Sequence, residues 1–147
     1  WLNTTLSIKL DMIKCISNKN LGGFAMSLLE SGENYLETIL VLTKRNGSVR
    51  SIDVANEMNF TKPSVSRAMS NLKKENLITM ETDGRLVLTE EGLKKATAIL
   101  ERHTILTRYI HEVLGVPEEI AEKDACRIEH IISPETFAGI KNQLKKA

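Results

Sequence analysis

Apolar residues recur with helical spacing along most of the chain after residue 25. Between Glu33 and Asn46 they stand three or four positions apart, which predicts an amphipathic helix that stops at Asn46-Gly47. Ser51 suits the N-cap of a second, short helix that runs to about Met58. The pattern therefore begins with two helices joined by a short loop.

A three-residue break at 59–61 separates the second helix from a third. Pro63 fits the first turn of that helix, because the amide there has no helical partner. The predicted apolar face of the third helix comprises Val65, Ala68, Met69 and Leu72. After Asn76 two strand-like runs flank Asp83-Gly84, a strong hairpin signal. Helix, short helix, tight break, helix and hairpin is the element order of a winged helix-turn-helix.

The second half of the chain is predicted to be entirely helical. A long helix runs from Thr89 to about Leu114-Gly115, Pro117 opens another that ends near Ser133, and Pro134 opens the last. The predicted fold is mainly α with a small β-hairpin wing. We expect a winged helix-turn-helix domain at 26–90, followed by an all-helical domain at 91–147. Residues 1–25, which end near the Gly22-Gly23 break, are interpreted as a leader or upstream extension of unknown role.

Composition agrees with a folded protein of one or two small domains. The chain has 147 residues, 41% of them hydrophobic, which is enough to bury a core and excludes a disordered or fibrous chain. No apolar run approaches the roughly 18 residues of a membrane-spanning helix. Two cysteines, Cys15 and Cys126, form no disulfide framework, so a reduced cytoplasmic protein without membrane attachment is expected.

The charge is nearly balanced overall but divided along the chain. The net charge is +1 for the whole chain, about +5 over Lys44–Lys74 and about −4 over Glu101–Glu135. One half is therefore suited to a polyanion and the other to a cation, although ordinary surface charge would give the same division.

The third helix and the hairpin carry side chains suited to DNA. Arginine reads guanine through paired hydrogen bonds, while lysines and hydroxyl groups contact phosphates or base edges. The candidate DNA-binding residues are Thr61, Lys62, Pro63, Ser64, Ser66, Arg67, Lys73, Lys74 and Arg85. The alternative is a winged-helix domain that contacts proteins through a merely solvated helix.

The acidic half contains the segment EKDACRIEH. At 100° per residue its Glu122, Cys126, Glu129 and His130 fall on one side of a helix. A thiolate, two carboxylates and an imidazole are a plausible ligand set for a borderline transition metal, whereas calcium or magnesium prefers oxygen ligands. Spacing alone leaves a second interpretation open, in which the cysteine is buried, the glutamates are solvated and the histidine has no special role.

Taken together, the motifs resemble the DtxR/MntR family of metal-dependent repressors. The resemblance runs from about Leu29 to Leu144 and rests on ENYLETI, TKPSVSRAMSNL, LVLTEEG, the pair Arg102-His103 and DACRIEHIIS. It implies metal ligands at Cys126, Glu129 and His130. It also implies ligands from the first helix, at Asn34 and Glu37, and at His103 in the long helix.

The chain departs from the family pattern at several of these positions. Asn34 stands where manganese-type members have aspartate and iron-type members methionine, while Cys126 follows the iron type and Glu37 the manganese type. Glu122 replaces an ancillary histidine and Thr107 a glutamate, so a second site is either altered to His103 plus Glu122 or lost. The resemblance implies Mn²⁺ or Fe²⁺ as the metal, with Co²⁺ or Zn²⁺ possible.

The resemblance further implies a repressor of metal-uptake genes that binds a palindromic operator as a homodimer. We expect the dimer surface at Leu106, Ile110, Val113 and the helices beyond Pro117, and we expect the third, SH3-like domain of longer members to be absent. No enzymatic activity is expected. One alternative is a metal-independent regulator of the MarR kind that senses an organic ligand or oxidation of Cys126. The other is an enzyme with Cys126 as nucleophile and His130 as base, for which the sequence offers no oxyanion hole.

Overall fold

The computed structural model describes residues 28–146, with side chains from residue 32 onward. The segment 1–25, expected to be a leader or extension, lies outside the described residues. The chain divides into two compact units, one ending at Thr97 and the other beginning at Ala98. None of the described helices combines the length and the apolar character that crossing a membrane requires.

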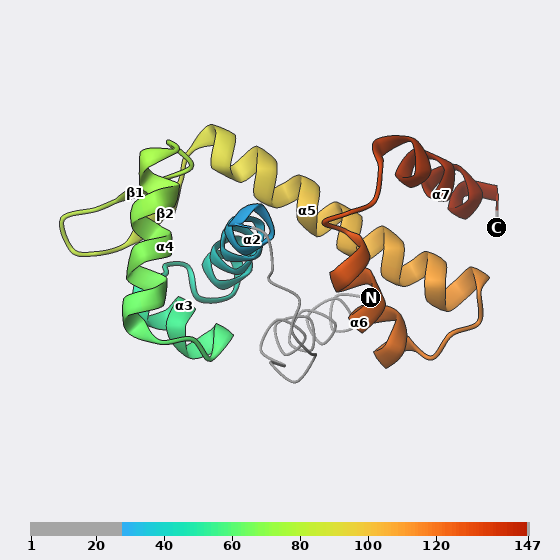
Figure 1. Ribbon diagram of the computed structural model, residues 1–147, viewed down its shortest axis with the longest axis horizontal. Helices are drawn as coiled ribbons and strands as arrows, with labels where there is room; N and C mark the ends of the chain where they lie inside the picture. The colour runs from blue at the N-terminus through green and yellow to red at the C-terminus, as the bar shows by residue number, and fades with distance from the viewer. Residues whose placement is uncertain (1–27, 147) are drawn as a thin grey trace. The chain divides into compact units, whose positions relative to one another are not determined.

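The first unit is a helix-turn-helix with a β-hairpin wing (Figure 1). Its elements are α2 (Leu28–Asn46), α3 (Ser51–Met58), α4 (Lys62–Lys74), β1 (Ile78–Met80), β2 (Leu86–Leu88) and the start of α5 (Glu90–Arg108). The core of this unit contains buried apolar side chains from all three of its complete helices, among them Leu36, Ile39, Leu42, Val54, Met58, Val65, Met69 and Leu72. The predicted fold class is confirmed.

Two predicted helix starts were wrong. Helix α2 begins at Leu28 rather than near Glu33, because Gly32 is tolerated inside a helix at a cost of about 1 kcal/mol. In α3 the N-cap is Arg50 rather than Ser51. The Arg50 backbone N–H donates to Asp53 Oδ2 at 2.8 Å, so the Asp53 carboxylate, and not the Ser51 hydroxyl, supports the start of α3.

The tight break between α3 and α4 has the predicted form. Asn59 ends α3 in the left-handed conformation, with φ 52°, which asparagine tolerates better than most residues. Thr61 is the N-cap of α4, where its side chain accepts a hydrogen bond from the Ser64 N–H, and a proline occupies the first turn. These contacts set the direction in which α4 leaves the turn.

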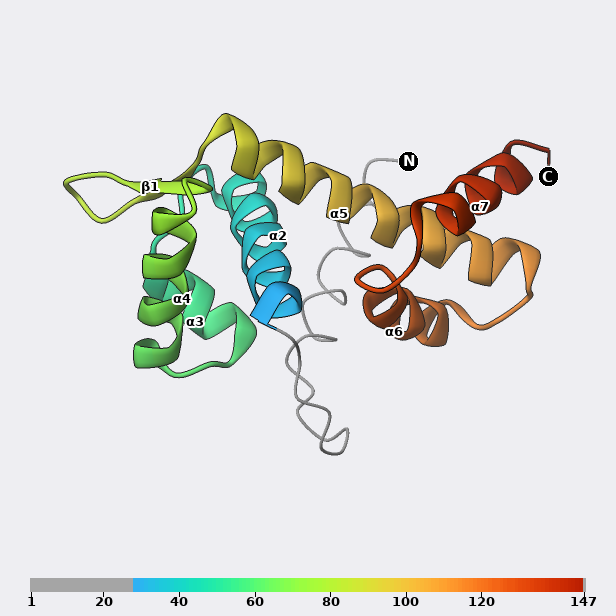
Figure 2. The same ribbon diagram turned by 45° about the horizontal axis from the view of Figure 1, so that its top comes forward.

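The wing is a two-stranded antiparallel hairpin that pairs Ile78 with Leu88 and Met80 with Leu86. Gly84 permits the turn because its φ is +84°, in the region that favours glycine. The Leu86 N–H donates to the Val49 carbonyl at 2.8 Å, and an isolated bridge joins residues 50 and 85. The hairpin is thereby hydrogen-bonded to the segment before α3. Figure 2 shows β1 beside α4.

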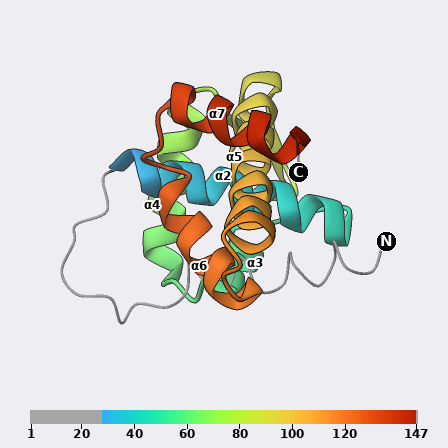
Figure 3. The ribbon, with the colours of Figure 1, turned by 90° about the vertical axis from the view of Figure 1, so that its right-hand side faces the viewer.

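The second unit is helical, as predicted. It contains the rest of α5, a π-helical turn η1 (Tyr109–Val113), α6 (Glu118–Ile128) and α7 (Pro134–Lys146). Gly115 follows η1 with φ +71°, which ends the long helix where the sequence predicted. Helices α6 and α7 both contact η1, and Figure 3 shows them beside the C-terminal part of α5.

The core of the second unit corrects the predicted dimer surface. Leu106 and Ile110 are buried with Ala121 and Ala125, against partly buried apolar side chains from α6, α7 and the adjoining loops. These two residues therefore stabilise the unit itself and are not available to a partner. Val113 is 41% exposed and remains on the surface.

Candidate metal centre and nucleic-acid interface

Two imidazoles flank one buried carboxylate in the second unit. His103 on α5 places Nδ1 2.9 Å from Glu129 Oε2, and His130 places Nε2 3.2 Å from Glu129 Oε1. The side chains are 1%, 0% and 6% exposed for His103, Glu129 and His130. A carboxylate buried this completely is unfavourable unless positive charge or hydrogen-bond donors compensate it. The cluster thus joins residues 26 positions apart in the sequence.

The end of α6 differs from the prediction in a way that shapes this cluster. The helix stops at Ile128 rather than near Ser133, and Glu129 is its C-cap. The Glu129 N–H still donates to the Ala125 carbonyl at 2.9 Å, so Glu129 keeps helical geometry while His130 lies in the turn beyond it. The predicted single helical face therefore holds for Cys126 and Glu129 but not for His130.

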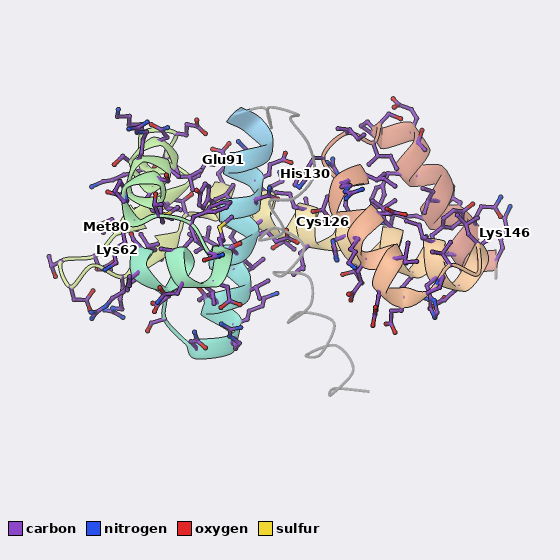
Figure 4. All side chains as sticks on the ribbon, turned by 60° about the horizontal axis from the view of Figure 1, so that its bottom comes forward. Lys62, Met80, Glu91, Cys126, His130 and Lys146 are labelled. Carbon is purple, nitrogen blue, oxygen red and sulfur yellow. The ribbon has the colours of Figure 1, made fainter. Side chains whose placement is uncertain are left out.

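Cys126 and Glu122 lie one turn apart on α6, and both are buried, with 8% and 7% exposure. Cys126 is not in a disulfide. Figure 4 shows Cys126 on α6 and His130 just past the end of that helix. Thr107 on α5 is also buried, and its hydroxyl has no hydrogen bond within the described part of the chain. Polar atoms buried in this unit therefore extend beyond the three clustered side chains.

The two candidate ligands of the first helix belong to the other unit. Asn34 and Glu37 lie one turn apart on α2, and both are buried, with 4% and 1% exposure. The Asn34 side-chain oxygen accepts no hydrogen bond from any described residue, although its backbone carbonyl accepts one from Thr38 at 2.8 Å. Buried amide and carboxylate oxygens on one side of a helix suit a cation better than an apolar core.

The donor set fits a divalent transition metal. Imidazole nitrogens and a carboxylate oxygen are ligands that manganese, iron(II), cobalt and zinc share, while calcium and magnesium prefer oxygen alone. Arg102, next to His103 in the sequence, donates from Nη1 to the Glu129 backbone carbonyl at 3.4 Å. That contact supports the end of α6, and the motif Arg102-His103 gave no indication of it.

Every candidate DNA-binding residue lies on the surface of the first unit. Burial of Val65, Met69 and Leu72 turns the opposite face of α4 to solvent. That face and its flanks present Thr61, Lys62, Pro63, Ser64, Ser66, Arg67, Lys73 and Lys74. The four cations of this group form no ion pair with any described residue, so α4 offers unneutralised positive charge. Figure 4 marks Lys62 at the start of α4.

Two other arginines of this unit form ion pairs with nearby carboxylates. Arg45 at the end of α2 forms a bidentate ion pair with Glu57 of α3, at 3.0 and 2.7 Å, and this contact raises the pKa of the guanidinium. Arg85 on the wing donates from Nε to Asp83 Oδ2 at 2.6 Å. Arg45 and Glu57 are 12 residues apart, so no local sequence pattern indicates that they pair. Asp83 and Arg85 are two residues apart in the turn around Gly84, and such a short spacing is compatible with a local pair.

Two family models match most of the chain. Residues 27–86 match the N-terminal DNA-binding domain of the iron-dependent repressors, and residues 89–147 match their metal-binding and dimerisation domain. Solved structures agree in fold: the manganese regulator SloR superposes with a TM-score of 0.70 at 22% identity, covering 79% of this chain and 54% of that one. IdeR of T. acidophilum gives 0.70 at 21% identity, covering 85% and 56%.

Relatives of known sequence carry matching names. The transcriptional regulator MntR of Escherichia coli is 36% identical over 105 residues, which are 71% of this chain and 67% of MntR. The diphtheria toxin repressor of Corynebacterium jeikeium is 31% identical over 108 residues, 74% of this chain and 45% of that protein. The chain thus spans about half the length of several curated relatives. These relatives are regulators rather than enzymes, and none supports the MarR-like alternative. The chain belongs to the iron-dependent repressor family, the DtxR/MntR family that its motifs resemble.

Proposed function

We propose that the protein is a metal-dependent DNA-binding transcriptional regulator that represses metal-uptake genes. The observation that carries this proposal is the buried Glu129 carboxylate between His103 and His130, in the unit that matches a metal-binding and dimerisation domain. A regulator of transcription acts where the DNA is, which places it in the cytoplasm. It acts as a homodimer on a palindromic operator, because two recognition helices related by a two-fold axis read two half-sites.

The metal ligands that we propose come from both units. His103, Glu129 and His130 form the set within the second unit, and Cys126 adds a thiolate from α6, the helix that Glu129 caps. Glu37 of α2, with Asn34 as a weaker amide ligand, completes the set in the metal-bound protein. Glu122 belongs to an altered second site, where Thr107 supplies a hydroxyl in place of a carboxylate.

This ligand set explains how metal can control DNA binding. A bound divalent cation supplies the positive charge that buried carboxylates need. Glu37 lies on a helix of the DNA-binding unit, while Glu129 belongs to the other unit, so sharing one cation favours a single arrangement of the two. The metal ion then shifts the equilibrium between arrangements of the units, because it binds more tightly to the arrangement that binds DNA.

The dimer surface is proposed at exposed apolar side chains of the second unit. Val113, Leu114 and Ile120 are 41%, 59% and 49% exposed, and they lie close together in the sequence around the turn between η1 and α6. Apolar side chains left on the surface of a small unit are typical of sites that a second copy covers. Leu106 and Ile110 are excluded from this surface by their burial.

A metal titration tests the proposal. DNA selected by the metal-loaded protein from a random pool is titrated with manganese, iron(II) under anaerobic conditions, cobalt and zinc, and then with a chelator. We expect at least one metal to raise affinity and the chelator to reverse the effect. Operator binding that is the same with metal and with chelator would refute the metal switch and favour a regulator of the MarR kind.

Arg67→Ala and Lys73→Ala should weaken DNA binding in different ways. Arg67 lies on the exposed face of α4, and loss of a bidentate base contact costs about 1–3 kcal/mol and relaxes preference at one base position. Lys73 is placed to contact phosphate, so its loss should weaken binding to all sequences and flatten the salt dependence. Competition binding with selected and random duplexes measures both. Equal losses on the two duplexes for both variants would refute base reading by Arg67.

Cys126→Glu should shift activation towards manganese and reduce the response to iron(II) or cobalt. The reason is that thiolate favours softer ions, while manganese prefers carboxylate, carbonyl and water. Metal-dependent operator binding is compared for Cys126→Glu and the unmodified protein. Cys126→Ser is the control, because it removes the sulfur and nearly keeps the volume of the side chain. If the sulfur does not ligate, the anaerobic cobalt complex of the unmodified protein shows no thiolate charge-transfer band and Cys126→Ser leaves metal preference unchanged.

A further inference from the structure

The turn of the wing holds an acidic residue against its arginine. Asp83 Oδ2 accepts from Arg85 Nε at 2.6 Å, and Asp83 Oδ1 accepts from the Arg85 backbone N–H at 3.1 Å. Both side chains are about half exposed, at 50% for Arg85 and 46% for Asp83. The pair is therefore accessible to a DNA backbone in a way that a buried ion pair is not.

Arg85 differs in this respect from the cations of α4. Lys62, Arg67, Lys73 and Lys74 form no ion pair with described residues, whereas the guanidinium of Arg85 is already neutralised. Residues 50 and 85 are joined by a backbone bridge, which brings a second arginine near the same turn. The contacts with Arg85, followed by the field of Arg50, hold the pKa of Asp83 below its usual range, so the carboxylate is charged at neutral pH.

The negative charge of Asp83 is not needed to form the turn. The Arg85 N–H requires only an acceptor oxygen, which an asparagine side chain supplies equally well in an Asx turn. The remaining turn contacts are backbone hydrogen bonds, from Gly84 N to the Glu81 carbonyl at 3.0 Å and from Glu81 N to the Arg85 carbonyl at 2.8 Å. The charge of Asp83 can therefore be removed without loss of the hydrogen bonds that form the turn.

We propose that Asp83 competes with DNA phosphate for Arg85 and so limits the sequence-independent affinity of the wing. The proposal rests on the DNA-binding function proposed above. A phosphate that approaches Arg85 must displace the aspartate and meets its repulsion. Contacts to phosphate carry no sequence information, so weakening one of them reduces binding to random DNA and leaves the discrimination made by α4.

Asp83→Asn tests the proposal, because it keeps the acceptor of the turn and removes the charge. Affinities for a random-sequence duplex and for a duplex selected by the manganese-loaded protein are measured over a range of salt concentrations. We expect both duplexes to bind about two- to fivefold more tightly at low salt, the range that one exposed ion pair supports. The slope of log affinity against log salt should steepen by up to about 0.9, the value for one added phosphate contact.

Glu81→Gln is the matched control. It removes the same charge two residues away in the same turn, and Glu81 forms no side-chain hydrogen bond or ion pair with the described residues. The second arm repeats Asp83→Asn in an Arg85→Ala background, where its gain should fall to that of Glu81→Gln. Neighbouring residues that act through each other show such non-additivity.

Two results would overturn the proposal: a gain from Asp83→Asn no larger than that from Glu81→Gln, or a gain that persists without Arg85. Either result leaves the DNA-binding function intact, because the unmodified protein still binds the selected duplex. Failure of the unmodified protein to bind any duplex, with or without metal, would refute the proposed function and this competition together.

Discussion

Glu129→Gln should abolish the metal-stimulated part of operator binding. The carboxylate contacts His103 and His130 at 2.9 and 3.2 Å in a buried cluster, so its replacement by a neutral amide removes the only carboxylate among the three donors. Loss of a metal ligand should lower metal affinity beyond the roughly 10–100-fold typical of residues that only support a ligand. Calorimetric metal titration and DNA binding with saturating metal measure the two consequences separately.

Glu112→Gln is the control for this variant. Glu112 is an exposed glutamate of the same unit whose pair with Arg108 lowers its pKa, and its replacement should change neither measurement. His130→Ala provides an independent test should the amide disturb folding, and His111→Ala, an exposed histidine of the same unit, is its control. Unchanged metal affinity and operator binding in folded Glu129→Gln and His130→Ala would refute the proposed metal centre.

Gly92→Ala should strongly destabilise the DNA-binding unit. A Cβ atom at Gly92 would lie 1.9 Å from the Leu77 carbonyl oxygen and 2.8 Å from its carbon, and both are backbone atoms that no side-chain rotation can move. The Leu77 carbonyl already accepts from Thr89 N at 3.0 Å, and Thr89 Oγ1 accepts from Gly92 N at 3.0 Å, so the start of α5 cannot shift without losing its cap. Overpacking of this kind costs about 1–3 kcal/mol and sometimes more.

Urea denaturation of Gly92→Ala measures this effect, with Gly139→Ala as the control. Gly139 lies within α7, where an added Cβ meets no atom within 4 Å. Its replacement by alanine should leave stability unchanged or raise it by up to about 1 kcal/mol, because alanine is the better helix former. Equal midpoints for Gly92→Ala and the unmodified protein would show that the close approach of Gly92 and Leu77 does not exist in solution.

Much of the first unit follows from local sequence signals. Thr61 and Pro63 begin α4, Asn59 ends α3, and Gly84 forms the hairpin turn, each through the backbone conformation or hydrogen bonds of neighbouring residues. Such interactions span a few residues and can be read from the order of amino acids. The motif around Glu129 is likewise local, and its residue types and spacing made it a candidate metal site.

Contacts between distant residues were decided only by the tertiary structure. Periodicity identified Leu106 and Ile110 as apolar positions, but an apolar face can cover a core or a partner, and packing against Ala121 and Ala125 made it the core. Spacing placed His130 on a helix that in fact ends at Ile128. The direct contact of His103 with Glu129 depends on how α5 and α6 pack, and side-chain packing between elements leaves no periodic signal in either segment. The sequence by itself determined the elements and the chemistry of the donors, while tertiary packing decided which of those donors meet.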